Sequence, residues 1–472
     1  MKVLLVIPPW VASRNRDFAV FIFPPHTGLA YIAAVLTKSG HEVRVIDAQA
    51  EGLSFREFGR RVQAFTPDLV GITSYTDQIE EAGKAARIIK ENNPEIPIIV
   101  GGYHVSALPA ETLEEFPHFD LAVQGEGEIC LEELAEWKNG RRGLEEIAGI
   151  AYRSNGRILA TPARPFMEDL DSLPFPAYEL FPLEKYAPYR GRGNKRKGLS
   201  LSTSRGCPYS CIFCCRVMGA RVRSQSPEAV LKNMKYLMDR FAVRLISFSD
   251  ENFTVKRDRT SLICEGIQKS GWQKKMNFYC ETRVDLVDRE LLRELGRSGC
   301  SVICFGIESG APEILQKAGK GIDLEQARNA VIWAREAGIT TKANFILGYP
   351  YEDKTHLKAT LDFALQLDTD LCVFAILIPF PGTRLMEMAQ RGEGGSRLLS
   401  RHWSDYGKHM SPVYETQELP RSVLERWQPW AYFRFYFRGR KIWNLFRFVR
   451  LKLLAYYLFK QLIINLRPGG KD

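Results

Sequence analysis

Three cysteines are the residues of this chain whose type and spacing point most directly to chemistry. Cys207, Cys211 and Cys214 stand in the run CPYSCIFC, which is a CxxxCxxC spacing. Thiolates on short loops bind iron-sulfur clusters, and a four-iron cluster normally takes four of them. Three thiolates leave one iron free to bind another molecule, which favours a catalytic cluster. The spacing alone also allows a structural zinc site with a fourth Cys or His, or three thiols that pack in a core.

The cysteine run and the segment GLSLSTSRG before it resemble the radical S-adenosylmethionine (SAM) superfamily, in which the three-cysteine loop follows the first strand of a partial β/α barrel. The resemblance implies that SAM chelates the free iron of a 4Fe-4S cluster and that one electron cleaves its sulfonium. A 5′-deoxyadenosyl radical then takes a hydrogen atom from an unactivated carbon. Cys215 lies outside the motif and is interpreted as a packing thiol, with a nearby acid or base as the alternative.

Length and cysteine usage set the outer limits. The chain has 472 residues, more than one hydrophobic core usually covers, so several domains are expected. Its ten cysteines form no evident disulfide framework, which favours a reducing, cytoplasmic compartment. Pro8 and Pro9 interrupt the apolar N-terminal run, which therefore predicts a first strand rather than a signal peptide.

Residues 1–140 alternate apolar runs with helical patterns, which predicts an α/β domain with a flavodoxin-like, doubly wound parallel sheet. Such sheets bind ligands beyond the carboxyl ends of their strands. Small, polar and turn-forming residues stand at those predicted ends, in the runs SYT at 74–76, GGYH at 101–104 and GEGE at 125–128. Periodicity by itself does not choose between FMN, a nucleotide and no ligand.

With the segment PPHTGLAYIAAVLTKSGHEVRVIDA, these runs resemble the cobalamin-binding domain of cobalamin-dependent radical SAM enzymes, a likeness that spans residues 1–390. The DxHxxG signature that supplies an axial His in other cobalamin proteins is absent after the first strand. His26 and His104 are candidates for contact with the corrin, although a His in such a loop is more often a capping or surface residue. The residues that the resemblance assigns to cobalamin are Pro9, His26, Ser74, Thr76, Gly101, Gly102, His104, Gly125 and Glu126.

Residues 141–197 look like a connector. Asn155-Gly156 predicts the turn of a β-hairpin, and a Pro-rich, basic stretch over 171–197 predicts an extended strap near the site. Residues 198–390 then hold six apolar runs that alternate with helical patterns. This pattern predicts a partial (β/α)6 barrel with its active site at the carboxyl ends of the strands, where the cysteine loop also lies.

The superfamily resemblance also assigns SAM contacts at successive strand ends. It places residues 249–251 near the amino group of SAM, 308–309 at the ribose and 348–352 along the adenine. Arg283 is a candidate for the SAM carboxylate, with an ion pair to Asp285 or Glu281 as an equal alternative. The assigned residues are Ser249, Asp250, Glu251, Arg283, Glu308, Ser309, Gly348 and Glu352.

Residues 391–472 form a basic, aromatic C-terminal region that is predicted to be helical. Residues 421–472 hold twelve Lys and Arg against two acids, which equals the net charge of +10 of the whole chain. Cations recur too often for a transmembrane helix, but 442–457 places its apolar residues on one helical face, as membrane-surface helices do. Packing of this region on the barrel is the alternative. Abundant Leu, Ile and Phe argue against nucleic acid as a partner.

Cobalamin beside a radical SAM barrel implies methylation of an unactivated carbon in a small-molecule or lipid-like substrate. An electron donor such as flavodoxin or ferredoxin is then expected as a partner. The enzyme is expected in the cytoplasm, with peripheral contact to the inner face of the membrane. The alternative enzyme activities are radical cyclisation, oxidation or carbon-carbon coupling, as in the anaerobic cyclase of the bacteriochlorophyll pathway. The alternative of another class is a non-catalytic iron-sulfur and cobalamin sensor.

Overall fold

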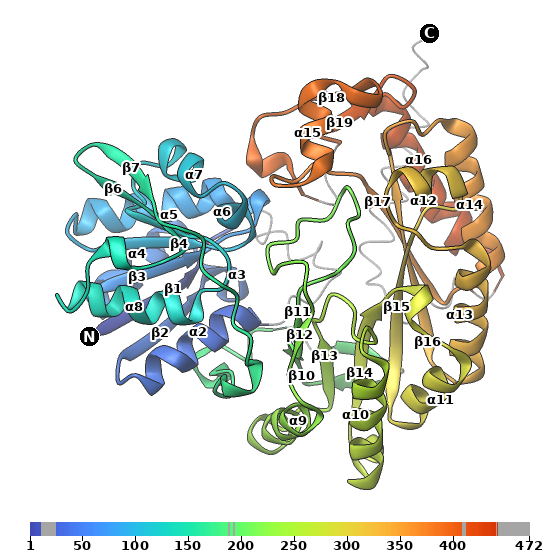
Figure 1. Cartoon of the computed structure of the whole chain (residues 1–472), viewed down its shortest axis with the longest axis horizontal. Coiled ribbons are helices and arrows are strands. Elements are labelled where there is room, and N and C mark those ends of the chain that lie inside the picture. Colours follow the sequence, from blue (N-terminus) through green and yellow to red (C-terminus); the bar gives the residue numbers. More distant parts are fainter. Residues whose placement is uncertain (11–24, 187–188, 192–193, 408–411, 440, 442–472) are drawn as a thin grey trace.

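The computed structural model describes residues 1–10, 25–186, 189–191, 194–407, 412–439 and 441 of the chain. Two α/β units lie side by side, and a smaller C-terminal region crosses from the second unit toward the first (Figure 1). The first unit contains a sheet in the strand order β2-β1-β3-β4-β5-β6-β7, and the second a sheet in the order β10-β13-β14-β15-β16-β17. The predicted α/β class, with two successive parallel sheets, is confirmed.

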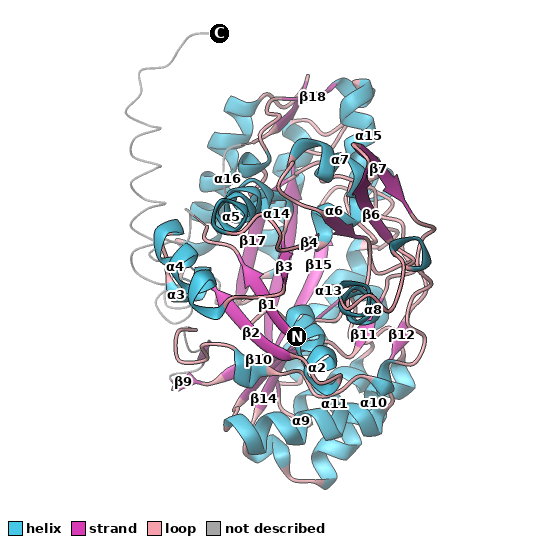
Figure 2. Cartoon of the chain, turned by 90° about the vertical axis from the view of Figure 1, so that its left-hand side faces the viewer, coloured by secondary structure: helices cyan, strands magenta, loops and turns pink. Residues whose placement is uncertain are grey.

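Strands β1 to β5 of the first sheet are parallel, and helices cover both of its faces (Figure 2). Val3 and Leu5 of β1 face the core formed with α2 and α8, whereas Leu4 and Val6 face the core formed with α4 and α5. Because strand side chains alternate, an unbroken apolar strand is what a sheet covered on both faces requires. The elements are β1 (Lys2–Ile7), α2 (Thr27–Lys38), β2 (Glu42–Asp47), α3 (Ala48–Glu51), α4 (Phe55–Phe65), β3 (Leu69–Thr73), η2 (Thr76–Gln78), α5 (Ile79–Asn92), β4 (Ile98–Gly101), α6 (Tyr103–Ala107), α7 (Pro109–Glu115), β5 (Leu121–Val123) and α8 (Glu128–Lys138).

The predicted hairpin forms, but it belongs to this first sheet. Strands β6 (Ile150–Ser154) and β7 (Arg157–Ala160) meet at Asn155 and Gly156, which both have positive φ, and β6 pairs antiparallel with β5. The boundary predicted at residue 140 therefore falls inside the sheet, because the pairing of a hairpin with a distant strand leaves no local mark on the sequence.

All six strands predicted for the barrel are present, in chain order and parallel, with β10 and β17 at the two edges. The carboxyl ends of these strands therefore lie along one rim of the sheet. The elements are β10 (Gly198–Leu201), β11 (Ser204–Arg205), β12 (Arg223–Ser224), α9 (Pro227–Phe241), β13 (Leu245–Phe248), α10 (Arg257–Lys269), β14 (Asn277–Thr282), α11 (Arg289–Arg297), β15 (Cys300–Glu308), α12 (Pro312–Lys317), α13 (Leu324–Glu336), β16 (Thr340–Leu347), α14 (Lys354–Leu367) and β17 (Leu371–Ile376).

The C-terminal region comprises α15 (Arg384–Arg391), β18 (Ser396–Leu398), η9 (Trp403–Asp405), β19 (Tyr414–Thr416) and α16 (Arg421–Tyr436). Helix α16 packs on the barrel: Gln428 Nε2 donates to Phe374 O over 2.9 Å, and Tyr436 Oη bonds to both backbone groups of Cys372. In this part of the tail, α16 therefore packs on the barrel, which was the alternative to contact with a membrane. The helix predicted over 442–457 lies outside the described residues. Within those residues, no helix is both long and apolar enough to cross a membrane.

The two units share one continuous core and touch again at the C-terminal region. The side chain of Tyr178 is fully buried, and its Oη bonds to Ser200 O of β10 (2.8 Å) and to Thr27 Oγ1 of α2 (3.1 Å). Trp403 packs edge-on against His104, at 4.8 Å between ring centroids, and its Nε1 donates to Glu115 over 2.9 Å. Segments on both sides of the barrel sequence thus hold the first unit.

One glycine controls how closely strands β3 and β4 approach at their ends. Gly102 has φ +111°, and a Cβ added there would lie 2.4 Å from Ser74 O. Gly40 also has positive φ, at +83°, but a Cβ there would meet nothing within 4 Å.

We predict that Gly102→Ala lowers the free energy of unfolding by more than ~2 kcal/mol, since it adds a backbone clash to the cost of the conformation. Gly40→Ala is the matched control and should cost about 1 kcal/mol, the conformational part alone. Urea unfolding of the two variants measures the difference, and equal losses would show that the approach to Ser74 is not tight.

Candidate active site

The three predicted cluster cysteines stand on a loop that a short two-stranded ladder closes at its base. Strands β11 and β12 pair antiparallel, with Arg205 directly opposite Arg223. Gly206 enters the loop with φ +91°, and a Cβ there would lie 2.3 Å from Arg221 O. The loop thus leaves the carboxyl end of the first barrel strand, where the active site of such barrels is found.

The three thiols differ in exposure and in their contacts. Cys211 is buried and Cys214 is exposed, while Cys207 Sγ lies 3.4 Å from Asn252 Nδ2, which donates to it. The neighbouring thiol of Cys214 and the cations Lys320 and Arg283 together lower the pKa of Cys211 to about 7, while the same pairing raises the pKa of Cys214. A thiol that ionises this readily suits a metal-bound thiolate.

This donor set fits an iron-sulfur cluster held by three thiolates, because soft sulfur ligands on one short loop are what such clusters use. In the described part of the chain, no three His, Cys, Asp or Glu side chains are gathered as ligands of a single metal ion. In a cluster of four irons each of the three cysteines would bind a different iron, so such a site does not require three ligands around a single metal ion.

Asp250, predicted to contact SAM, instead anchors the start of the cysteine loop. Its carboxylate accepts from Thr203 N and Thr203 Oγ1, both over 2.6 Å, and from Ser204 Oγ over 2.7 Å. A buried carboxylate with three short bonds has little capacity left for a ligand, so only the backbone of Asp250 is left for the predicted contact with SAM, which stays a prediction. Its neighbours Ser249 and Glu251 are exposed at the same strand end, and Glu251 Oε1 accepts from Gly206 N over 3.4 Å.

Arg283 forms the ion pair that was its alternative to the SAM carboxylate. Its Nε and Nη2 donate to the two carboxylate oxygens of Asp285, both over 2.9 Å, and Nη2 also donates to Lys320 O over 2.7 Å. The guanidinium lies 3.6 Å from the ring centroid of Tyr209, within the cysteine loop. Arg283 therefore supports the loop, through a cation–π contact.

Glu308 and Ser309, both predicted to contact the ribose of SAM, stand at the end of β15. Glu308 has φ +74°, and its Oε1 pairs with the buried Lys320 over 3.0 Å. Ser309 is fully buried; its Oγ bonds to Thr360 Oγ1 and accepts from Ala311 N, both over 3.1 Å. The hydroxyl of Ser309 is thus occupied by protein partners, and the predicted ribose contacts of Glu308 and Ser309 stay predictions.

Glu352 shapes the turn after β16. Its Oε2 accepts from Gly348 N (2.6 Å) and Tyr349 N (3.0 Å), while its Oε1 is buried without a hydrogen-bond partner. Burial raises the pKa of this carboxyl to about 8. The side chain is fully buried, so its contribution is to hold the backbone of Gly348 and Tyr349.

On the first unit, the predicted cobalamin residues gather at the carboxyl ends of neighbouring strands. Ser74, after β3, donates its backbone N–H to Gly101 O at the end of β4 over 2.9 Å, and Thr76 is buried nearby. Pro9 is buried after β1. Gly125 N donates to Ser106 Oγ over 3.0 Å. This edge thus has closely packed backbone and few side chains.

Two tyrosines that sequence reasoning passed over stand on this edge. The rings of Tyr75 and Tyr103 stack at 5.6 Å between centroids and 21° between planes, with 44% and 40% of their surfaces exposed. Burial raises the pKa of Tyr103, and Tyr75, Glu251 and Cys215 raise it further. Glu251 and Cys215 belong to the second unit, so the pair of tyrosines faces the barrel. Open aromatic faces beside a glycine-lined edge fit a flat macrocycle such as a corrin.

The two histidines have structural roles. His26 caps α2: its Nδ1 accepts from Leu29 N over 3.1 Å, which leaves Nε2 to carry the proton toward Thr73 Oγ1 at 3.5 Å. His104 is buried in α6 against Trp403. Burial lowers the pKa of each to about 4, so both are neutral. In the structure the two rings serve as a cap and a packed ring, and their predicted contacts with the corrin stay predictions.

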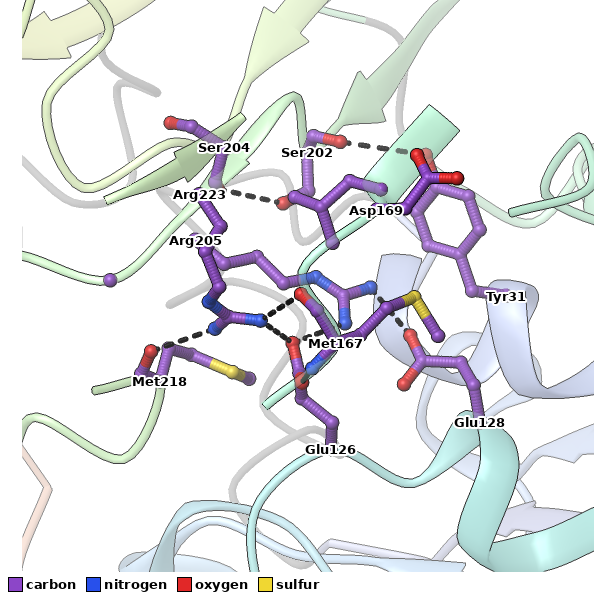
Figure 3. A network of polar contacts seen from close by, with 12 residues as sticks. Tyr31, Glu126, Glu128, Met167, Asp169, Ser202, Ser204, Arg205, Met218 and Arg223 are labelled. Atoms are coloured by element: carbon purple, nitrogen blue, oxygen red, sulfur yellow. Dashed lines mark hydrogen bonds and ion pairs between the residues drawn. The ribbon is translucent and has the colours of Figure 1, made fainter. Parts of the chain in front are cut away.

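Glu126, predicted to contact cobalamin, is the centre of a buried ion-pair network between the units (Figure 3). Its Oε1 accepts from Arg205 Nη1 (2.8 Å) and Arg223 Nη1 (2.7 Å), and its Oε2 accepts from Met167 N (2.7 Å). Arg205 Nη2 also donates to Glu128 over 2.5 Å. The sequence analysis did not single out either arginine. The position of Arg205, two residues before Cys207, was the signal that could have indicated a charged contact at the base of the loop.

A cavity of about 700 Å³ lies between the cysteine loop and the first unit. Cys211, Cys214 and Cys215 line it from the loop, and Ser106 and Gly125 line it from the ends of the first sheet. The thiols thus open into a space that both units enclose.

Known proteins agree with this arrangement. Residues 23–135 match the B12 binding domain, and residues 201–364 match the Radical SAM superfamily. The chain is 34% identical over 445 residues to an uncharacterized methyltransferase of Pyrococcus horikoshii, covering 93% of each protein. It is 29% identical over 430 residues to the anaerobic magnesium-protoporphyrin IX monomethyl ester cyclase of Rubrivivax gelatinosus, covering 90% of this chain and 75% of the cyclase.

The fold is shared with a solved structure, that of the cobalamin-dependent S-adenosylmethionine radical enzyme OxsB with aqua-cobalamin and S-adenosylmethionine bound. The TM-score is 0.75 at 22% identity, covering 99% of this chain and 73% of that one. The chain is thus a radical SAM enzyme. More narrowly, it belongs to the members of that superfamily that carry a B12-binding domain ahead of the barrel. The predicted cofactors, a 4Fe-4S cluster, SAM and cobalamin, are those of this family.

Glu352 makes stability depend on pH in a defined direction. Its pKa in the folded chain, about 8, lies above the ordinary value of 4.5. The folded chain therefore keeps a proton that the unfolded chain has lost, and this contribution to stability is complete below pH 4.5 and lost as the pH rises to 8. We predict that the free energy of unfolding of the natural protein falls relative to Glu352→Gln between pH 5 and 8, by up to ~1.4 kcal/mol per pH unit. Parallel curves from urea titrations at several pH values would contradict it.

Proposed function

We propose that the enzyme transfers a methyl group to an unactivated carbon of a small-molecule or lipid-like substrate. The observation that carries this proposal is the shared cavity, in which Cys211 and Cys214 of the barrel face Ser106 and Gly125 of the B12-binding domain. When bound, the cofactors supply reductive cleavage of SAM and a methyl group for carbon. The similarity to a methyltransferase over 93% of the chain supports the same activity.

We assign the residues as follows. Cys207, Cys211 and Cys214 hold the cluster, and Asn252 donates to the sulfur of Cys207. Ser249, Glu251, Glu308 and the backbone at Gly348 are the proposed SAM contacts, since they stand at the carboxyl ends of the barrel strands β13, β15 and β16. Ser74, Thr76, Gly101, Gly102 and Gly125, with Tyr75 and Tyr103, form the proposed cobalamin face.

Reductive cleavage of SAM needs one electron from outside the chain. A small electron-transfer protein such as flavodoxin or ferredoxin is the proposed reductant.

The activity is tested with methyl-labelled SAM on anaerobically reconstituted protein and a lipid and small-molecule extract of cells. Label should enter an extractable product, together with release of 5′-deoxyadenosine. Cys211→Ala should lose the iron and at least ~10³-fold of SAM cleavage, because one cluster ligand is gone. Cys215→Ala, its neighbour outside the motif, is the matched control and should keep both.

Release of 5′-deoxyadenosine with product formation but without label would favour the second candidate, a cyclisation or oxidation. The specific observation behind that candidate is the 29% identity to an anaerobic cyclase over 90% of the chain. Absence of any SAM cleavage by loaded protein would favour a sensor.

We also propose that residues 442–472 bind the surface of an anionic membrane. They hold six Lys and Arg against one acid, among many Leu, Ile, Phe and Tyr residues. Because α16 packs on β17, a truncation that tests this must keep that helix.

A chain that ends at Lys441 should therefore bind liposomes containing phosphatidylglycerol at least ~10-fold more weakly than the full chain, since several headgroup contacts are lost. Co-sedimentation at two salt concentrations measures this, with phosphatidylcholine liposomes as the control. Unchanged binding after truncation, or equal binding to the neutral liposomes, would refute membrane contact through this segment.

A further inference from the structure

A cluster of four charged side chains joins the B12-binding domain to the base of the cysteine loop. Arg205 and Arg223 come from the loop, and Glu126 and Glu128 come from the B12-binding domain. All four side chains are at most 8% exposed. Two cations and two anions balance, so the cluster carries no net charge.

The arginines are placed to control the loop. They are opposite each other in the β11–β12 ladder, which closes the segment 206–222 that carries all three cluster cysteines. Arg205 is two residues before Cys207. Both arginines reach the same oxygen of Glu126, over 2.8 and 2.7 Å. One carboxylate of the B12-binding domain thus fixes both strands at the base of the loop.

The surroundings leave this contact little freedom. Arg223 also donates to Met167 O (2.7 Å) and Met218 O (2.9 Å), and the ring of Phe166 lies 4.7 Å from its guanidinium. Glu126 itself follows Gly125, which lines the cavity between the units. The same carboxylate therefore stands beside the space proposed for the cofactors and at the base of the cluster loop.

We propose that Glu126 is a positioning residue that sets the placement of the cysteine loop relative to the B12-binding domain, and so the spacing of cluster and corrin. This inference rests on the proposed function for its consequence, because methyl transfer requires the two cofactors to share one substrate. Removal of Glu126 leaves Arg223 without its carboxylate partner in a low dielectric and Arg205 with Glu128 alone, so the loop should separate from the domain.

The first experiment is hydrogen exchange of the full, reconstituted protein, which needs neither substrate nor turnover. Glu126→Ala should speed amide exchange in residues 206–222 by about tenfold or more, while α13 on the far side of the barrel stays unchanged. Glu126→Gln, which keeps an acceptor oxygen, should give a smaller increase. Glu133→Ala is the matched control, since Glu133 pairs with Arg142 and Arg164 and, in the described part of the chain, forms no ion pair with the loop arginines.

The second measurement reads the spacing itself. In reduced protein that holds both cofactors, the spin relaxation of cob(II)alamin depends on its distance from the reduced cluster. Glu126→Ala at full iron and cobalt content should slow this relaxation. Unchanged exchange in 206–222, an equal rise throughout the chain, or unchanged relaxation would each overturn the proposal.

Should Glu126→Ala not fold, Glu128→Ala carries the same test, since it removes only the ion pair to Arg205, with an expected effect of about threefold. The outcomes also separate this inference from the proposed function. A cyclase that transfers no methyl group would still show the exchange pattern, whereas a methyltransferase with an indifferent Glu126 would not.

Discussion

The placement of the active site depends on a buried, balanced cluster of charge at the base of one loop. Arg205 and Arg223 would each carry a large desolvation cost if they faced an apolar surface, and this cost is offset only while Glu126 and Glu128 stay beside them. Apolar packing tolerates small sliding movements, but hydrogen-bonded ion pairs accept a narrow range of distances and angles. The position of the loop relative to the B12-binding domain is therefore fixed by the directions of these ion pairs as well as by the burial of the side chains.

Other polar groups around the cysteines extend the same principle. Asp250 holds the backbone and hydroxyl of Thr203, Arg283 holds Asp285 and Tyr209, and Lys320 holds Glu308. Each of these charged side chains is hydrogen-bonded to or ion-paired with another part of the protein. These contacts hold the loop in place without a ligand. Such preorganisation suits radical chemistry, because a reactive carbon radical has to meet one hydrogen atom in one direction.

The fold followed from the sequence because its signals are local. Unbroken apolar strands such as 3–7, alternating with helical patterns, predicted both parallel sheets, and the cysteine spacing predicted the loop at the first barrel strand. The attachment of the hairpin to β5 had no such signal, since pairing between 121 and 152 is a matter of tertiary contact. Site residues were the least predictable part. A carboxylate such as Glu126 or Asp250 looks the same in sequence whether it binds a cofactor or a buried partner, and only the partner decides. Tyr75 and Tyr103 were missed because an aromatic in a loop usually packs, and their open faces are visible only in three dimensions.

The contact between Trp403 and the B12-binding domain has a consequence for how substrates reach the active site. Tyr178 and the arginines hold that domain from segments at the start of the barrel sequence, and Trp403 holds it from a segment after the barrel. A swing about either attachment would strain the other, so the two attachments together oppose separation of the halves. A passage between units held at two places would select substrates by its shape rather than by a movement of domains.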